Sequence, residues 1–369
     1  MSELKVDKVS PRSGTYVSLN TVGMKNIIIN GDMSIAQRGT SYTGLTNGDN
    51  GYFTCDRYKT ANDVSGTWTQ SQSTDVPTGQ GFAKSLKMDC TTANGSLSSN
   101  SVLFLSQKFE GQNLQYIKKG TSSAESLTLS FWVKSNKTGT YIAELFDIDN
   151  LRQISKSYTI DASNTWEKKT LTFEGDTTGT LDNNNERSID INLFLTAGTN
   201  YTSGTLGTSW QSYDDTDRAV GQVNLADSTA NEWYVTGLQL EAGTTASDFE
   251  FLPHDVNLLR CQRYCYSESA GDTYHNYVNG FFTSTTLFIG NLNLPTSMRS
   301  GPSITTSGSF VVSSIISTSV TSFGIVDSNV NDVNTIQIRA NTSGQTAGQG
   351  ANIRNDNDAT ATFILSSEL

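Results

Sequence analysis

The feature that most constrains this chain is a series of short strand-like runs separated by turn-forming residues. In the run 127–134, every second residue is apolar and falls on the same side: Leu127, Leu129, Phe131 and Val133. This alternation is typical of a β-strand with one buried face. Nine further runs lie between residues 27 and 241, most of them separated by Gly, Asn, Asp or Ser. The pattern predicts antiparallel sheets packed face to face, as in a jelly roll.

Two segments are candidates for the opening and closing strands of that jelly roll. Residues 26–39 combine apolar β-formers with an Asn-Gly turn, and residues 233–243 alternate apolar with small or polar side chains. Both patterns suit edge strands that seal a sandwich. The stretch 197–217 is rich in Gly and Asp, and we expect it to form a long surface loop.

The composition supports an all-β fold with more than one domain. Only 35% of the 369 residues are hydrophobic and 17% are charged, and the Ser, Thr, Asn and Gly that replace them favour turns and strand edges over helices. The length exceeds one average domain. We expect four segments: an N-terminal anchoring arm at 1–23, a large jelly-roll β-sandwich at 24–252, a connector helix at 253–265 and a smaller C-terminal β-sandwich at 266–369.

The two short segments are predicted from local signals. Residues 1–23 are polar and cannot build a core, so we expect the arm to order only against another surface. In the connector, Pro253 suits a first helical turn and Asp255 places negative charge at the positive end of the helix dipole. Cys261 and Cys265 would then lie on one face of the helix.

The charge distribution excludes two classes of partner. The net charge is −11, and no lysine follows Lys169. Nucleic acids and anionic membrane surfaces are bound by clustered cations, so we expect neither as a partner. No segment approaches the ~18 apolar residues that cross a bilayer, and the first residues lack the apolar core of a signal peptide. We therefore expect no membrane insertion and no export by a cleaved signal.

The residues that usually carry catalysis are sparse. The two histidines lie in or just after the connector, and no Gly-x-Ser-x-Gly elbow is present. A glycosidase needs two carboxylates ~5–9 Å apart, which Glu144 with Asp147, or the acidic group at 214–217, could supply. We expect no enzyme, and we keep surface-polysaccharide depolymerase as an alternative. Sugar rings stack on exposed aromatic side chains, which makes Trp132 and Trp210 the candidates for glycan contact.

Four short groups in the sequence contain Asn30, Gly31, Asp32, Gln37, Arg38, Gly39, Asp56, Arg57, Gln239, Glu241, Cys261, Gln262, Arg263 and Tyr264. These fourteen family-signature residues resemble marks found in tail fibres and other virion structural proteins of bacteriophages, many of them marine or cyanobacterial. The first group also resembles the start of jelly-roll carbohydrate-binding modules. The likeness covers nearly the first 265 residues.

The resemblance implies a structural component of a phage virion. It would be a tail fibre or tail-attached appendage located in the virion tail and synthesised in the host cytoplasm. It would be a homotrimer that docks to other tail proteins through residues 1–23 and attaches to a host-surface glycan. The alternative is another virion part, such as a capsid decoration, nozzle or baseplate protein. We expect no cofactor except a structural calcium, for which the module likeness nominates Asp32 and Glu241, although Thr236-Gly237 stands where such modules usually carry an Asp.

Overall fold

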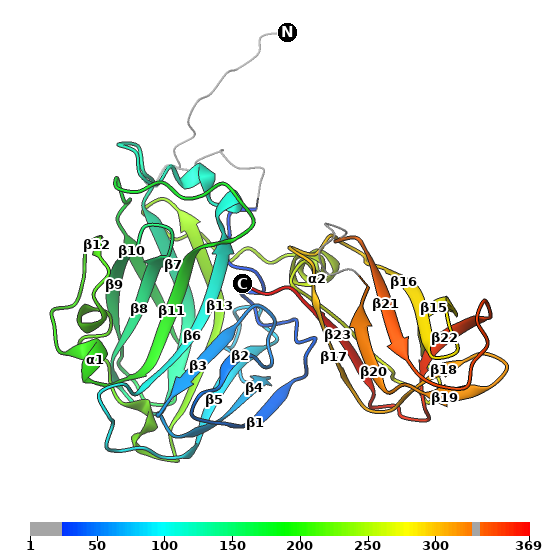
Figure 1. Cartoon of the computed structure of the whole chain (residues 1–369). Helices are drawn as coiled ribbons and strands as arrows, with labels where there is room; N and C mark the ends of the chain where they lie inside the picture. The colour runs from blue at the N-terminus through cyan, green and yellow to red at the C-terminus, as the bar shows by residue number, and fades with distance from the viewer. Residues whose placement is uncertain (1–23, 327–332) are drawn as a thin grey trace, which may run out of the picture.

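The computed structural model describes residues 24–326 and 333–369 and places them in two lobes (Figure 1). The predicted arm at 1–23 lies outside the described residues. Strands dominate both lobes, and all the strand pairs among the described residues are antiparallel. The predicted all-β class with packed sheets is confirmed.

Two sheets form the larger lobe. The six-stranded sheet has the order β1 (Ser41–Leu45), β4 (Thr67–Ser73), β5 (Ser85–Thr92), β13 (Glu232–Ala242), β7 (Leu127–Ser135) and β10 (Glu167–Phe173). The seven-stranded sheet has the order β12 (Gln211–Ser212), β9 (Arg152–Ile160), β8 (Gly139–Asp147), β11 (Arg187–Ala197), β6 (Val102–Glu110), β3 (Lys59–Asp63) and β2 (Asn50–Tyr52).

The core of the larger lobe lies between these sheets. Trp68, Phe131 and Trp233 come from the six-stranded sheet and are fully buried, as is Leu193 from β11. Successive residues of a strand point to opposite faces, so the alternation in the sequence becomes one buried and one outer face per sheet. Each large apolar side chain buried in this way contributes roughly 1.5–3 kcal/mol.

The predicted pair of sealing edge strands is wrong. Strand β13 is central, with β5 on one side and β7 on the other. Residues 26–39 contain no strand, because the chain turns where Asn30 and Met33 adopt positive φ of 60° and 59°. The Asn26 side chain accepts hydrogen bonds from the Ile28 and Leu240 amides at 3.0 Å each, so it replaces strand pairing at this point.

The stretch predicted as a surface loop contains short elements. It includes α1 (Thr199–Thr202), β12 and the 3-10 turn η3 (Asp215–Asp217). It folds over the outer face of the seven-stranded sheet, where Tyr201 and Leu206 pack against the buried Phe194. Strand β9 lies outside the strand-like runs predicted from the sequence, although it pairs along its whole length with β8.

The smaller lobe follows helix α2 (His254–Gln262), which is shorter than the predicted connector at 253–265 and has Pro253 as its N-cap residue rather than in its first turn. Its three-stranded sheet has the order β14 (Cys265–Ser269), β23 (Thr362–Ser366) and β17 (Ser303–Ser307). Its seven-stranded sheet has the order β19 (Ser317–Ser319), β18 (Phe310–Ser313), β22 (Gly350–Asn355), β15 (Asn276–Phe282), β16 (Leu287–Asn293), β21 (Thr335–Asn341) and β20 (Ser322–Ile325). Buried aromatic residues, among them Phe282, Phe288 and Phe363, form a separate core.

The cysteines do not share a helix face. Cys261 lies in α2, whereas Cys265 begins β14, because the helix ends at Gln262. All four cysteines are buried thiols without a disulfide bond. No helix among the described residues has the length and apolar character needed to span a bilayer.

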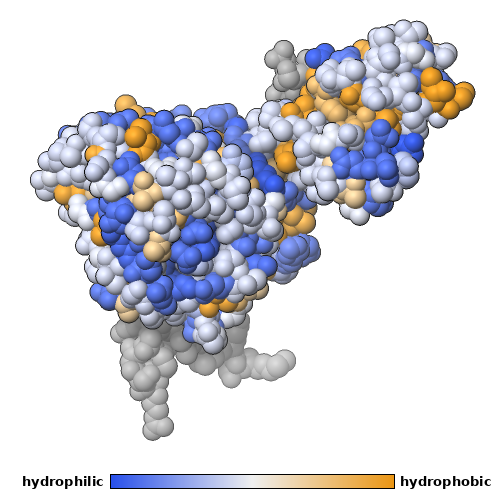
Figure 2. Space-filling view, turned by 90° about the horizontal axis from the view of Figure 1, so that it is seen from below, coloured by the Kyte–Doolittle hydropathy of each residue, from blue (hydrophilic) through white to orange (hydrophobic). Residues whose placement is uncertain are grey.

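The surfaces of the two lobes differ. The larger lobe shows mainly hydrophilic atoms in the view of Figure 2, whereas hydrophobic atoms gather on the smaller lobe, including its end away from the larger one. Ile315 and Ile316, in the turn between β18 and β19, expose 89% and 51% of their surface. Phe281 on β15 exposes 51%.

Candidate functional site

Most of the family-signature residues meet at the junction between the two lobes. They come from the irregular segment 26–39, from the turn before β3, from β13 and from α2. Residues 367–369, which follow β23, return to the larger lobe and complete the junction (Figure 1). The junction is therefore built from segments that are far apart in the sequence.

One layer of the junction fixes the irregular segment. The Asn30 amide donates to the backbone oxygens of Ile35 and Asp56 at 2.9 and 3.0 Å. The Gln37 amide donates to the Cys265 oxygen at 2.6 Å and also to the carboxylate of Asp56. Burial raises the pKa of Asp56 to about 6, although the hydrogen bonds from Gln37 oppose that shift.

A second layer pairs arginines with Glu368. Arg57 is fully buried, forms an ion pair with Glu368 and lies 3.4 Å from the centroid of the Tyr264 ring. Arg38 approaches the same carboxylate at 3.2 Å. The chain that returns from the smaller lobe therefore supplies the carboxylate for both arginines.

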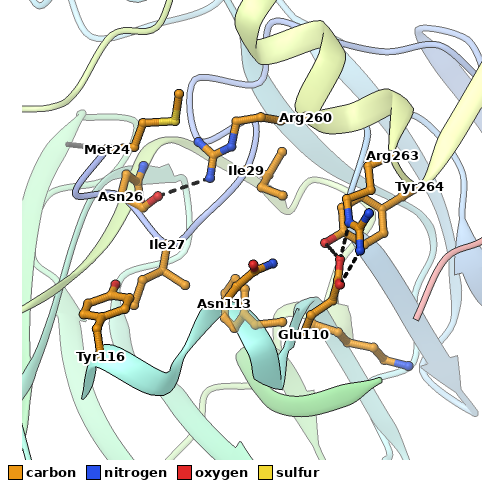
Figure 3. A pocket seen from close by; sticks show the side chains of 12 residues that line it. Met24, Asn26, Ile27, Ile29, Glu110, Asn113, Tyr116, Arg260, Arg263 and Tyr264 are labelled. Carbon is orange, nitrogen blue, oxygen red and sulfur yellow. Dashed lines mark hydrogen bonds and ion pairs between the residues drawn. The ribbon is translucent and has the colours of Figure 1, made fainter. Parts of the chain in front are cut away.

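A third layer joins the two residues directly after α2 to the end of β6, as Figure 3 shows. Arg263 donates from Nε and Nη2 to the two carboxylate oxygens of Glu110, at 2.7 Å each, and the Tyr264 hydroxyl also donates to Glu110. Burial would raise the pKa of Glu110, but the hydrogen bonds from Arg263 and Tyr264 outweigh it and lower the pKa. These contacts make α2 part of the larger lobe's surface.

The remaining signature residues support the same region. Gly31 has no side chain, which lets its backbone approach β13 closely, and its backbone oxygen accepts a hydrogen bond from the Leu238 amide at 3.0 Å. Gln239 and Glu241 bind each other at 3.0 Å and hold Ser247. Gly39 has a positive φ of 126°, Cys261 is buried beside Tyr264, and Gln262 is half-buried in the last turn of α2.

The residues predicted to bind calcium are already engaged in hydrogen bonds. Asp32 accepts from Ser34 and from Asn257 at 3.0 and 3.1 Å, and Glu241 accepts from Ser247. Within residues 24–326 and 333–369, no group of three or more His, Cys, Asp or Glu side chains could hold a metal ion. The structural calcium stays a prediction.

A separate cleft of about 240 Å³ lies on the outer face of the seven-stranded sheet of the larger lobe. Strand register places two rows of side chains on this face, since opposite residues of paired strands share a face. One row crosses β3, β6, β11 and β8, and the other crosses β6, β11 and β8. The rows are Lys59, Ser106, Asn192 and Glu144, and Lys108, Asp190 and Phe146.

The floor of the cleft offers polar atoms without protein partners. Ser106 and Asn192 are 3% and 2% exposed and both line the cleft. Neither the Ser106 Oγ nor the Asn192 Oδ1 has a hydrogen-bond partner among the described residues. Buried polar atoms are nearly always hydrogen-bonded, and leaving one unpaired costs about 1–3 kcal/mol. This floor is suited to a ligand that carries hydroxyl groups.

The folded-over stretch 197–217 and the residues just after it supply one wall of the cleft. The Tyr213 ring packs 5.2 Å from the Phe146 ring and is 38% exposed. Arg218 lies against both rings and donates to the two carboxylate oxygens of Glu144 at 2.8 Å each. Burial would lower the pKa of Arg218, but the Glu144 carboxylate raises it. An aromatic wall beside a polar floor is a common arrangement in ligand sites.

Cations outnumber carboxylates in the cleft. Arg187 is bound to Asp190 with an Nε to Oδ1 distance of 2.7 Å, so this pair is neutral. No carboxylate side chain among the described residues forms an ion pair with Lys59 or Lys108, and Lys108 donates to a main-chain oxygen of the last residue, Leu369, at 2.8 Å. Burial, then the neighbouring Lys59 and Arg187, lower the pKa of Lys108 to about 8.

The two predicted glycan-contact tryptophans lie outside the cleft and apart from each other. Trp132 is half-buried on the outer face of the six-stranded sheet, opposite Lys168 and Thr236. Trp210 packs partly against the inter-sheet core and donates from its indole nitrogen to the Glu174 oxygen at 2.7 Å. Lys59, Ser106 and Asn192 carry no local sequence signal, because only strand pairing brings them together.

No protein-family model and no curated protein sequence matches this chain. Solved structures that are similar in fold include the enzymatically active domain of tailspike protein 4 from bacteriophage CBA120, with 13% identity, a TM-score of 0.31, and coverage of 59% of this chain and 21% of the tailspike chain. This chain thus spans about a fifth of that chain's length.

Two further solved structures match a similar share of this chain. A putative sugar-binding protein from Bacteroides thetaiotaomicron is 11% identical with a TM-score of 0.32, and the match covers 59% of this chain and 100% of that one. The family 11 carbohydrate-binding module from Clostridium thermocellum, solved with a mixed-linked tetrasaccharide, is 11% identical with a TM-score of 0.29. That match covers 56% of this chain and 99% of the module.

Proposed function

We propose that this chain is a non-enzymatic, carbohydrate-binding structural component of a phage virion, a tail fibre or tail-attached appendage whose larger lobe binds glycan in the outer-face cleft. The observation that carries this proposal is that two residues lining the cleft, Ser106 and Asn192, each hold a buried side-chain oxygen without a protein hydrogen-bond partner. Sugar hydroxyls would satisfy both atoms while a sugar face packs against Tyr213.

Binding without hydrolysis is supported by the state of the cleft carboxylates. Glu144 accepts two hydrogen bonds from Arg218, and Asp190 accepts two from Arg187. A glycosidase needs one carboxyl group as proton donor and a second as base or nucleophile. Both carboxylates are already occupied by arginine side chains, so neither is free to engage a scissile glycosidic bond, and we favour attachment over polysaccharide degradation. Release of reducing ends from a bound polysaccharide would instead support a depolymerase.

The test of the cleft is glycan-array screening of the purified protein followed by calorimetric titration with the best ligand. The variant Tyr213→Ala removes an exposed ring and should weaken binding about three- to tenfold. Its matched control is Trp132→Ala, which removes a half-buried ring from the opposite sheet and should leave affinity unchanged. Loss of binding in Trp132→Ala with wild-type binding in Tyr213→Ala would move the site to the other face.

The virion role rests on the sequence resemblance, with attachment achieved by several weak contacts. A homotrimer would present three clefts, and effective concentration would turn single contacts of roughly millimolar affinity into firm adhesion. The exposed Ile315 and Ile316 support a contact between copies of the smaller lobe. Light scattering should report a trimer, and a monomer at micromolar concentration would contradict this part of the proposal.

The place in the particle is the remaining part of the proposal. Residues 1–23 would dock to other tail proteins after synthesis in the host cytoplasm. Imaging of intact particles with this chain labelled should place it on the tail. Label on the capsid, nozzle or baseplate would favour the alternative virion roles.

A further inference from the structure

We infer that the cleft selects an acidic glycan, one whose sugar carries a carboxylate or phosphate group, and that Lys59 and Lys108 bind that group. This inference rests on the proposed glycan-binding function and specifies its ligand class.

The first step is the uneven charge of the cleft. Arg187 and Arg218 are already neutralised by Asp190 and Glu144 at hydrogen-bond distance. Lys59 and Lys108 both line the cleft, and neither forms an ion pair with a carboxylate side chain among the described residues, although Lys108 donates to a main-chain oxygen of Leu369. Two lysines without an ion-paired carboxylate side chain in one cleft are notable in a chain with a net charge of −11, where solubility alone requires no such grouping.

The second step is that this grouping is unfavourable without a ligand. Lys108 is only 9% exposed, and the charges around it are Lys59 and Arg187, which lower its pKa, and Asp190, which opposes them. Like charges held in a partly buried site repel each other, and the depressed pKa of Lys108 reflects that cost together with burial. An anion placed between the lysines would relieve the repulsion, and charge-assisted hydrogen bonds are the strong ones.

The third step is geometry. Lys59 lies directly opposite Ser106, and Ser106 lies opposite Asn192, along one row of the sheet. The Ser106 hydroxyl and the Asn192 side-chain oxygen are the partnerless atoms of the floor. A sugar whose hydroxyls satisfy these atoms would place an adjacent acidic substituent beside the Lys59 ammonium, at the end of the same row.

The experiment compares charged and neutral members of two matched ligand pairs by calorimetric titration of the full chain. One pair is oligogalacturonate and its carboxyl-reduced form, and the other is a phosphorylated oligomannoside and the unmodified oligomannoside. We expect one charged member to bind roughly tenfold tighter than its neutral partner at low salt, with the preference shrinking at high salt. The pair that shows the preference identifies carboxylate or phosphate as the recognised group.

Two variants locate the effect. Lys59→Gln should remove most of the preference for the charged member, and it is expected to fold because Lys59 holds no ion pair in the structure. Lys168→Gln removes the same charge from the exposed outer face of the other sheet, beside Trp132, and should preserve the preference. Equal loss in both variants would overturn the assignment to the cleft.

The remaining outcomes separate the two proposals. Equal affinity for the charged and neutral members of both pairs overturns the acidic-ligand inference and leaves glycan binding intact. Absence of binding to all four ligands and to a broad glycan array overturns both.

Discussion

Replacing Glu368 by Gln should weaken the docking of the smaller lobe on the larger one. The side chain of Glu368 is 7% exposed and that of Arg57 is 1% exposed. Arg57 would stay in place, because it also donates to the Lys108 oxygen at 2.7 Å and packs on the Tyr264 ring. Its charge would then be buried without a carboxylate.

The magnitude follows from that burial. Removing one partner of a buried ion pair costs about 3–5 kcal/mol, because the other charge stays desolvated. The matched control is Glu186→Gln, which also removes a junction carboxylate. Glu186 is 67% exposed where it meets Arg299 at 3.3 Å, so its loss should cost about 1 kcal/mol at most.

Differential scanning calorimetry with limited proteolysis measures the effect. For lobes of this size, a loss of about 3 kcal/mol lowers the melting temperature of the affected unit by about 6 °C or more. In Glu368→Gln we expect a lower melting temperature and faster cleavage in the segment around α2. Calorimetric and proteolysis traces matching those of Glu186→Gln would refute the reasoning.

Three further changes test the fold. Burial raises the pKa of Asp56 to about 6, so the folded state holds that proton more tightly than the unfolded state, and the resulting stabilisation, present below about pH 4, is lost as pH rises through 6. Denaturant unfolding at pH 4 and pH 7 should therefore show the wild type losing up to roughly 3 kcal/mol of unfolding free energy relative to Asp56→Asn. A difference between the two proteins that does not change with pH contradicts this. Gly31→Ala would place a methyl group 2.1 Å from a backbone oxygen of β13 and should cost about 1–3 kcal/mol by urea unfolding, whereas Gly95→Ala, with no neighbour within 4 Å, should stay within about 0.5 kcal/mol. Phe131→Ala in the core should cost about 3–5 kcal/mol, and Phe281→Ala on the surface should cost far less; similar losses would argue against the assigned faces.

The sequence predicts the fold class because alternation is a local property. The run at 127–134 becomes β7, and Pro253 precedes α2, since both signals act within a few residues. The segment 26–39 was misjudged because Asn26 and Asn30 bind distant backbone atoms, which local pattern cannot reveal.

The candidate site was less predictable for a related reason. The resemblance selects residues such as Arg57 and Arg263, which the structure places at the junction between lobes. The cleft depends instead on the pairing of β3, β6, β11 and β8, which are separated by long stretches of chain. A lysine and a serine in two of these strands become neighbours only after the sheet forms.

The return of residues 367–369 to the larger lobe has a mechanical consequence. The chain enters the smaller lobe through α2, and the smaller lobe is bound to the larger one a second time by the ion pair of Glu368 with Arg57 and by the backbone oxygen of Leu369, which accepts a hydrogen bond from Tyr52 at 3.0 Å. A body held at one point swivels, whereas a body held at two resists torque. A force applied to the far end of the smaller lobe would thus act on both connections at once, and the two lobes would transmit tension as one stiff unit.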